Sequence, residues 1–167
     1  FQLAQSFTWL GEPLNISLSL GIDGIAAPMV LLTGIVLFAA ILVSWNIEHR
    51  PKDYFVLLMM LVTGVYGVFL ARDIFFLFFF YELAVLPMYL LIGVWGSSSD
   101  FGTFLRTKEY GALKLVLYLV AGSVFIWIAI LALYWASAQS GTPSFSMETL
   151  QTVNFDTEFR HFQTVVF

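Results

Sequence analysis

The sequence predicts an all-α polytopic membrane protein, and its composition and long apolar runs are the observations that predict it. Of 167 residues, 60% are hydrophobic and 11% are charged, and the mean hydropathy is +0.89. Soluble domains carry roughly 25% charged residues, so a water-soluble globule is excluded. About 20 apolar residues cross the hydrocarbon core of a bilayer. Four stretches come close to or exceed this length: residues 25–45, 54–71, 74–95 and 111–135.

These four stretches are expected to be transmembrane helices rather than barrel strands. Their apolar runs are continuous and show no period-2 alternation. In lipid, a helix satisfies its own backbone hydrogen bonds, whereas a strand needs neighbours. Aromatic residues that are typical of the headgroup level mark several of the ends: Trp45, Tyr54, Trp95 and Trp135.

The spans differ in the polar residues that they carry. Residues 25–45 and 54–71 contain no charged side chain. Gly64, Gly67 and Ala71 form a stripe of small residues on the second span, which is typical of close helix packing. The third span contains one acid and the fourth contains one base.

The distribution of Lys and Arg predicts the orientation of the chain. The loops after the first and third spans hold two such residues each: Arg50 and Lys52, then Arg106 and Lys108. The other segments hold two in total, Arg72 and Arg160. The excess places the first and third loops in the cytoplasm. Residues 1–24 are then expected to be an extracytoplasmic pre-helix segment, and residues 136–161 an extracytoplasmic loop.

The last residues, 162–167 (FQTVVF), turn apolar again and are expected to start a further helix. The chain is therefore expected to be a piece of a larger membrane protein.

Several classes of site are not expected in this chain. The seven Lys and Arg residues form no cluster and the formal net charge is −4, so nucleic-acid binding is not expected. The lack of cysteine excludes disulfides, thiolate zinc sites and iron–sulfur clusters. His49 and His161 have no second ligand at metal spacing, and no catalytic centre is visible.

Glu82 is the strongest functional signal in the sequence. It is the ninth residue of the third span and would lie ~12 Å inside the bilayer. A bare carboxylate there costs at least about 2.5 kcal/mol, so the group must be neutral, paired or in contact with water. A hydrogen-bonding role in helix packing is the alternative. Pro87, five residues later, removes one helical hydrogen bond and could open a kink and a water site beside Glu82.

Lys114 is the corresponding base of the fourth span. If the helix begins at Gly111, Lys114 snorkels to the surface; if it begins near Leu105, the side chain lies deep enough to be a buried proton site. Tyr110, Lys114 and Tyr118 follow at helical spacing and form one polar stripe. A direct salt bridge between Lys114 and Glu82 requires the longer helix.

The run around Glu82, FFFYELAVLPMYLLIGVWG, resembles the most recognisable stretch of the antiporter-like subunits of respiratory complex I. Within that family it is most similar to the M-type subunit of proton-pumping NADH-quinone oxidoreductase, the equivalent of mitochondrial chain 4 and of the D-type chain of the plastid-type enzyme. Three further stretches agree in order: LSLGIDGIAAPMVLLTG (18–34), GVFLARDIFFLFFF (67–80) and KEYGALKLVLYLVAGSV (108–124). Tyr81 departs from the pattern, since the family commonly has Trp there.

The resemblance implies a proton-pumping subunit in which these spans are the third to sixth helices of a larger bundle. Glu82 matches the glutamate of the family's fifth helix and Lys114 the lysine of its sixth helix. Pro87 and Tyr118 are possible supporting residues. The family's central lysine, on the seventh helix, would lie beyond residue 167.

The resemblance also implies a setting for the chain. The partners would be the lipid bilayer and the other membrane-arm subunits of complex I, of the N, L, K, A, J and H types. NADH, flavin, iron–sulfur clusters and quinone would bind to partner subunits, with no cofactor in this chain. The bacterial inner membrane is the expected location, with the thylakoid and the mitochondrial inner membrane as alternatives.

The sequence offers three candidate functions. The first is proton translocation coupled to quinone reduction, with Glu82 and Lys114 exchanging protons, so that the chain is a subunit of an H⁺-translocating enzyme without a redox centre of its own. The second is a subunit of a multi-subunit cation/proton (Na⁺/H⁺) antiporter, which shares the fold and these motifs. The third, a structural membrane anchor, leaves Glu82 unexplained.

Overall fold

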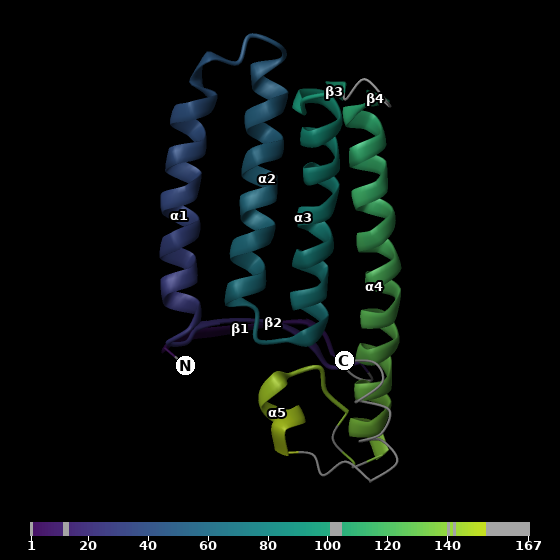
Figure 1. The fold of residues 1–167 in the computed structure, drawn as a ribbon. Coiled ribbons are helices and arrows are strands. Elements are labelled where there is room, and N and C mark those ends of the chain that lie inside the picture. The colour runs from purple at the N-terminus through teal and green to yellow at the C-terminus, as the bar shows by residue number, and fades with distance from the viewer. Residues whose placement is uncertain (1, 12–13, 101–104, 140, 142, 153–167) are drawn as a thin grey trace.

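The computed structural model describes residues 2–11, 14–100, 105–139, 141 and 143–152. Its body consists of four long helices: α1 (Ala26–Val43), α2 (Pro51–Leu70), α3 (Ile74–Trp95) and α4 (Lys108–Gln139). The helices stand side by side in chain order, each antiparallel to the next (Figure 1). All four are long and apolar enough to cross a membrane, which confirms the predicted polytopic helical fold.

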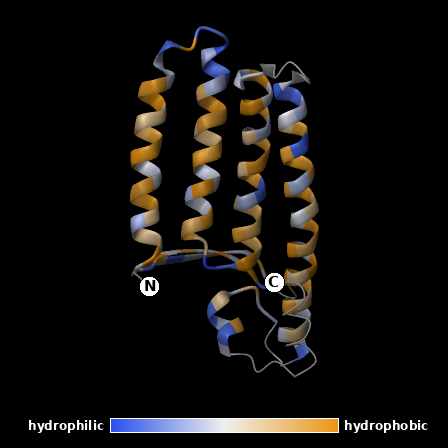
Figure 2. Cartoon of the chain, in the orientation of Figure 1, coloured by the Kyte–Doolittle hydropathy of each residue, from blue (hydrophilic) through white to orange (hydrophobic). Residues whose placement is uncertain are grey.

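Apolar residues dominate the bodies of the four helices, and polar residues gather mainly at their connections (Figure 2). The packing is uneven along the row. α3 makes extensive contacts with α2 on one side and with α4 on the other, whereas α1 packs only lightly against α2. The third helix is therefore the best-supported member of the row.

Small residues let α2 and α3 approach closely. A Cβ atom at Gly64 would lie 2.9 Å from the Phe80 carbonyl oxygen, and one at Gly67 would overlap the Phe80 ring. Any larger side chain at these positions would push α3 away. The predicted packing role of the glycine stripe is confirmed.

Some helix ends differ from the predicted ones. α1 ends at Val43 and passes into the 3-10 turn η1 (Ser44–Asn46), and α2 begins at Pro51 because proline suits the first turn of a helix. α4 exceeds the predicted residues 111–135 at both ends. It starts earlier because the Thr107 hydroxyl accepts a hydrogen bond from the Tyr110 N–H, at 3.3 Å, and caps the first turn.

The segment before α1 is a β-hairpin, which the sequence analysis did not predict. β1 (Gln2–Leu10) pairs antiparallel with β2 (Ile16–Ile22) and crosses the helix ends beside the α2–α3 turn (Figure 1). Ile16 is buried with Phe78, Ile130 and Phe145, so the hairpin contributes to a small apolar core. The alternation ISLSL in β2 is the period-2 signal that identifies such a strand.

Asp73 caps the start of α3 and is itself buried. Its Oδ1 accepts hydrogen bonds from the backbone N–H of Phe75 (2.9 Å) and of Phe76 (3.4 Å). The residue is 1% exposed, and Oδ2 has no hydrogen-bond partner among the described residues. Burial raises the pKa of Asp73 above its ordinary value of 3.8, and the backbone amides of Phe76, Phe75 and Ser17 offset part of that rise.

Backbone hydrogen bonds fasten the α2–α3 turn on both sides. The Arg72 N–H donates to the Ser19 carbonyl of β2 at 2.9 Å, and the Met147 N–H donates to the Arg72 carbonyl at 3.1 Å. The Arg72 guanidinium also pairs with Glu148 at 2.8 Å. Met147 and Glu148 begin the short helix α5 (Met147–Thr152), so the hairpin and α5 hold this turn between them.

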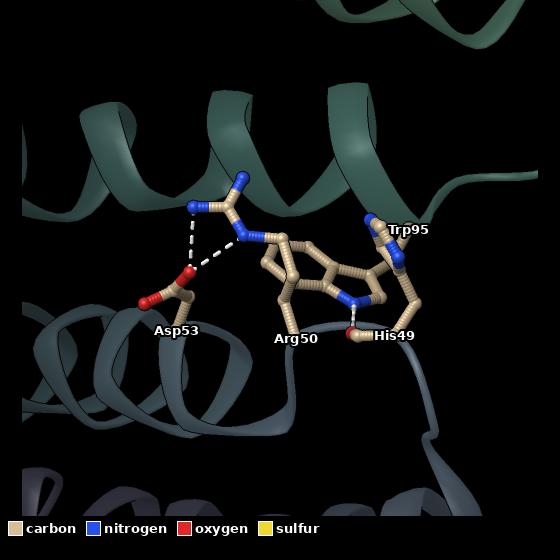
Figure 3. A network of polar contacts seen from close by, with 4 residues as sticks. All are labelled: His49, Arg50, Asp53 and Trp95. Carbon is tan, nitrogen blue, oxygen red and sulfur yellow. Dashed lines mark hydrogen bonds and ion pairs between the residues drawn. The ribbon is translucent and has the colours of Figure 1, made fainter.

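The opposite end of α3 is attached to both neighbouring connections. The Trp95 indole N–H donates to the His49 carbonyl at 2.8 Å, beside Arg50 and its ion pair with Asp53 (Figure 3). Lys108 Nζ donates to the Val94 carbonyl at 2.6 Å, which places a cation at the negative end of the helix dipole. The short strands β3 (Ser99–Asp100) and β4 (Leu105–Arg106) pair next to this point.

The predicted loop at residues 136–161 contains the last turn of α4 and the helix α5. Residues 153–161 of that loop, and the predicted start of a further helix at 162–167, lie outside the described residues.

We expect Gly64→Ala to destabilise the α2–α3 pair by about 1–3 kcal/mol, because the new methyl group meets the Phe80 backbone. The thermal unfolding midpoint of the purified complex that contains the full-length subunit measures this effect. Gly122→Ala in α4 is the matched control, since a Cβ there meets nothing within 4 Å. Equal midpoints for the two variants would contradict the close α2–α3 contact.

Asp73 predicts a pH-dependent stability of the α2–α3 turn. Because its pKa is raised in the folded state, its contribution to stability is fully present below pH 3.8 and is lost as the pH rises through the folded-state pKa. Hydrogen exchange of the Phe75 and Phe76 amides, corrected for intrinsic rates, measures this loss. Asp73→Asn keeps the cap and is expected to abolish the pH dependence.

Asp73→Ala is the companion variant because it removes the cap as well as the charge. Relative to Asp73→Asn, it is expected to lower the local stability by about 1 kcal/mol at every pH, because neither side chain titrates. A pH dependence that persists in Asp73→Asn would show that another group produces it.

Candidate functional site

Glu82 lies near the middle of α3, between α2 and α4, and is half-buried. Its Oε1 accepts a hydrogen bond from the hydroxyl of Ser123, a buried residue of α4. The same hydroxyl lies 2.9 Å from the Leu119 carbonyl oxygen. The carboxyl group therefore has a hydrogen-bond donor inside the helix row, as an acid in the middle of an apolar helix requires.

The face of α4 toward α3 is lined with small residues that allow this contact. Ala112 is 0% exposed, and a Cβ atom at Gly93 of α3 would lie 3.9 Å from its methyl group. Ser123, eleven positions further along the helix, lies on the same buried face. Because these side chains are short, α4 brings the Ser123 hydroxyl within reach of Glu82.

Pro87 is buried inside α3, and the helix continues through it from Ile74 to Trp95. Proline has no backbone N–H, so it donates no hydrogen bond to the carbonyl of Leu83, next to Glu82. The Leu83 carbonyl, one residue after Glu82 in the chain, is thus left without its usual helical donor. The predicted kink and water site remain predictions.

Lys114 lies on a different face of α4 from Ser123. It is exposed, and its ammonium lies 5.8 Å from the centre of the ring of Tyr118, which is 69% exposed. An α-helix turns about 100° per residue, so the separation from Lys114 to Ser123 places their side chains on opposite sides of the helix.

The structure therefore does not bring Glu82 and Lys114 together. α4 has the longer form that a direct salt bridge requires, yet no ion pair between the two occurs among the described residues. Depth and direction both separate the two groups, because Ser123, which reaches Glu82, lies nine residues, about 14 Å, along α4 from Lys114 and on the opposite side of the helix. Lys114 and Tyr118 do share one face, as the helical spacing predicts.

Sequence reasoning missed Ser123, which is the partner of Glu82. Its signal was a hydroxyl within a long apolar run, nine positions from Lys114 and so on the other face of the helix. As to metals, the described part of the chain has no group of three or more His, Cys, Asp or Glu side chains placed to hold an ion.

Comparison with known proteins gives a family match. The transmembrane family described as "NADH:quinone oxidoreductase/Mrp antiporter, TM" matches residues 71–166, more than half of the chain. This region includes α3 and α4, and so contains Glu82, Lys114 and Ser123.

Two curated relatives from cyanobacteria illustrate the match. NAD(P)H-quinone oxidoreductase chain 4 3 of Picosynechococcus sp. is 40% identical over 133 residues, which cover 80% of this chain and 22% of that protein. NAD(P)H-quinone oxidoreductase chain 4 of Gloeobacter violaceus is 32% identical over 160 residues, which cover 96% of this chain and 28% of that protein. The chain thus spans about a quarter of the length of these relatives.

Solved structures share the fold. A chain of respiratory complex I from Thermus thermophilus with bound NADH matches with a TM-score of 0.73 and 22% identity, over 93% of this chain and 30% of that one. A chain of the membrane-bound sulfane sulfur reductase, an archaeal respiratory membrane complex, matches with a TM-score of 0.62 and 19% identity, over 86% and 21%.

The family match and the four helices long enough to cross a membrane both indicate a transmembrane protein. The chain belongs to the NADH:quinone oxidoreductase/Mrp antiporter transmembrane family, as an integral membrane segment of an antiporter-like helical bundle.

Proposed function

We propose that this chain is part of a proton-translocating membrane-arm subunit of an NAD(P)H-quinone oxidoreductase, and that Glu82 carries the proton within it. The observation that carries the proposal is an ionisable group at mid-membrane depth with a hydrogen-bond donor from the next helix. A carboxyl group held in this way has a partner in the ionised form, so the membrane interior does not force it to stay neutral.

In the proposed mechanism, Glu82 alternates between an ionised and a protonated state. A cation nearby stabilises the ionised state, and loss of that cation favours uptake of a proton. Lys114 lies on the other face of α4, so this cation comes from a helix outside the described residues, as the resemblance to the family implies. Lys114 serves a different step, passing protons on its own side of α4 with Tyr118 beside it.

Redox chemistry belongs to partner subunits in this proposal. NADH or another donor, flavin, iron–sulfur clusters and quinone bind elsewhere in the assembly, and the chain contacts other membrane-arm subunits and lipid. The cyanobacterial relatives favour a thylakoid or bacterial plasma membrane as its location.

A cation/proton antiporter subunit is the second candidate, because the description of the matched family names Mrp antiporters as well. The two candidates differ in their partners. Purification of the tagged full-length protein from its host membrane separates them: quinone-reductase subunits recovered with it support the first, and their absence from a stable antiporter assembly supports the second.

Glu82→Gln tests the role of the carboxyl group. The variant keeps the side-chain size and removes the charge, so we expect proton pumping and quinone reduction by the assembled complex to fall by at least about tenfold. Glu109→Gln, which changes an exposed acid in the first turn of α4, is the control and is expected to retain activity. Unchanged activity of Glu82→Gln would mean that Glu82 only packs the helices.

Lys114 is tested with two substitutions. Lys114→Met removes the charge, and Lys114→Arg keeps a cation that does not release its proton. If Lys114 passes protons, both variants are expected to lower pumping several-fold in vesicles. Wild-type pumping by Lys114→Arg would show that a fixed positive charge suffices, which contradicts the relay.

A further inference from the structure

Ser123 lies between two acceptors and has a single hydroxyl hydrogen. It is 6% exposed, it donates to Glu82 Oε1, and its Oγ lies 2.9 Å from the Leu119 carbonyl oxygen. Because one hydrogen serves one strong bond at a time, the hydroxyl has two competing orientations. Which orientation is preferred depends on the charge of Glu82.

When Glu82 is ionised, the carboxylate is the better acceptor. Hydrogen bonds to a charged partner are roughly twice as strong as those between neutral groups. The Leu119 carbonyl, in contrast, already accepts the usual helical bond, and a back-bond from serine adds little to it. The Ser123 hydroxyl then donates its hydrogen bond to Glu82.

When Glu82 is protonated, the roles of donor and acceptor reverse. The carboxyl O–H requires an acceptor, and the Ser123 oxygen offers a lone pair. The serine hydrogen turns to the Leu119 carbonyl, which is within hydrogen-bond distance. Both states of Glu82 are satisfied without movement of a helix, and the serine keeps its own hydrogen throughout.

We propose that Ser123 is a positioning residue for proton transfer at Glu82, and that its hydroxyl turns between Glu82 and the Leu119 carbonyl as the proton arrives and leaves. The inference rests on the proposed function, in which Glu82 carries a proton. It adds a residue on α4 that determines how readily the carboxyl group exchanges that proton.

Other ionisable groups of the helices packed on α3 point elsewhere. On α2, the Tyr66 hydroxyl lies toward α1, 3.3 Å from a Cβ built at Gly34. On α4, Lys114 and Tyr118 contact each other on a face away from Ser123. Lys52, Asp53, Tyr54, Lys108, Glu109 and Tyr110 belong to the helix ends near the connections, and Tyr134 stacks on Phe145 near the opposite end.

The test compares Ser123→Ala with Ser123→Thr in the assembled complex. Ser123→Ala removes the donor to the ionised carboxylate, so the limb of the pH–activity profile governed by Glu82 is expected to move to higher pH by about 1–2 units. The infrared C=O band of the protonated carboxyl, assigned by its loss in Glu82→Gln, is expected to persist to correspondingly higher pH. Ser123→Thr keeps a hydroxyl and is expected to restore both.

Ser137→Ala is the matched control. Ser137 is also buried on α4, but its hydroxyl donates to the Tyr134 carbonyl at 2.7 Å, far along the helix from Glu82. Its pH profile and infrared band are expected to match those of the wild type. If Ser123→Ala does not assemble, Ser123→Cys replaces it, since a thiol is of similar size and is a weak donor.

The outcomes separate this inference from the proposed function. An unchanged pH profile and band in Ser123→Ala, together with the loss of activity in Glu82→Gln, would overturn the role of Ser123 and leave the proton role of Glu82 standing. Full activity of Glu82→Gln would overturn both. A shift in Ser123→Ala that Ser123→Thr does not reverse would assign the effect to packing and would also overturn the inference.

Discussion

The close approach of α2 to α3 is the contact on which the rest of this structure depends. Gly64 leaves room for the Phe80 backbone and Gly67 leaves room for the Phe80 ring, so the two helices approach closely. Phe80 is within one turn of Glu82, and the contact therefore fixes the part of α3 that carries the acid. α4 then packs on the other side and supplies Ser123. Small residues on both flanks of α3 place one polar pair inside an otherwise apolar row.

Two acidic side chains of α3, one in the middle of the helix and one at its start, are each held by hydrogen-bond donors. At mid-membrane depth, Glu82 is matched by a serine hydroxyl from the neighbouring helix. At the helix end, Asp73 is matched by the amides of the first turn of α3, but one of its oxygens has no partner among the described residues. The single hydroxyl partner of Glu82 suits a group that gains and loses a proton. The backbone amides that bind Asp73 suit a helix cap.

Sequence reasoning predicted the features that depend on composition and depth, and missed those that depend on direction. The four helices and the mid-membrane position of Glu82 follow from apolar length alone. The face of Lys114 does not, because it depends on where the buried side of α4 lies, which Ala112 and Ser123 define only after packing. The hairpin was missed because its signal, the period-2 alternation ISLSL in β2, spans only five residues and is far shorter than the apolar runs of the helices. The proton roles of Glu82 and Lys114 remain predictions.

The attachments of α3 at both ends have a mechanical consequence. Asp73 and the backbone bonds of Arg72 hold one end, and Trp95 and the Val94 carbonyl hold the other. Because α3 is attached at both ends, it resists translation along its axis. It lacks one internal hydrogen bond at Pro87, so it bends most easily there. A displacement at one end of α3 would therefore bend the helix near Pro87 and Glu82 instead of shifting it along its axis.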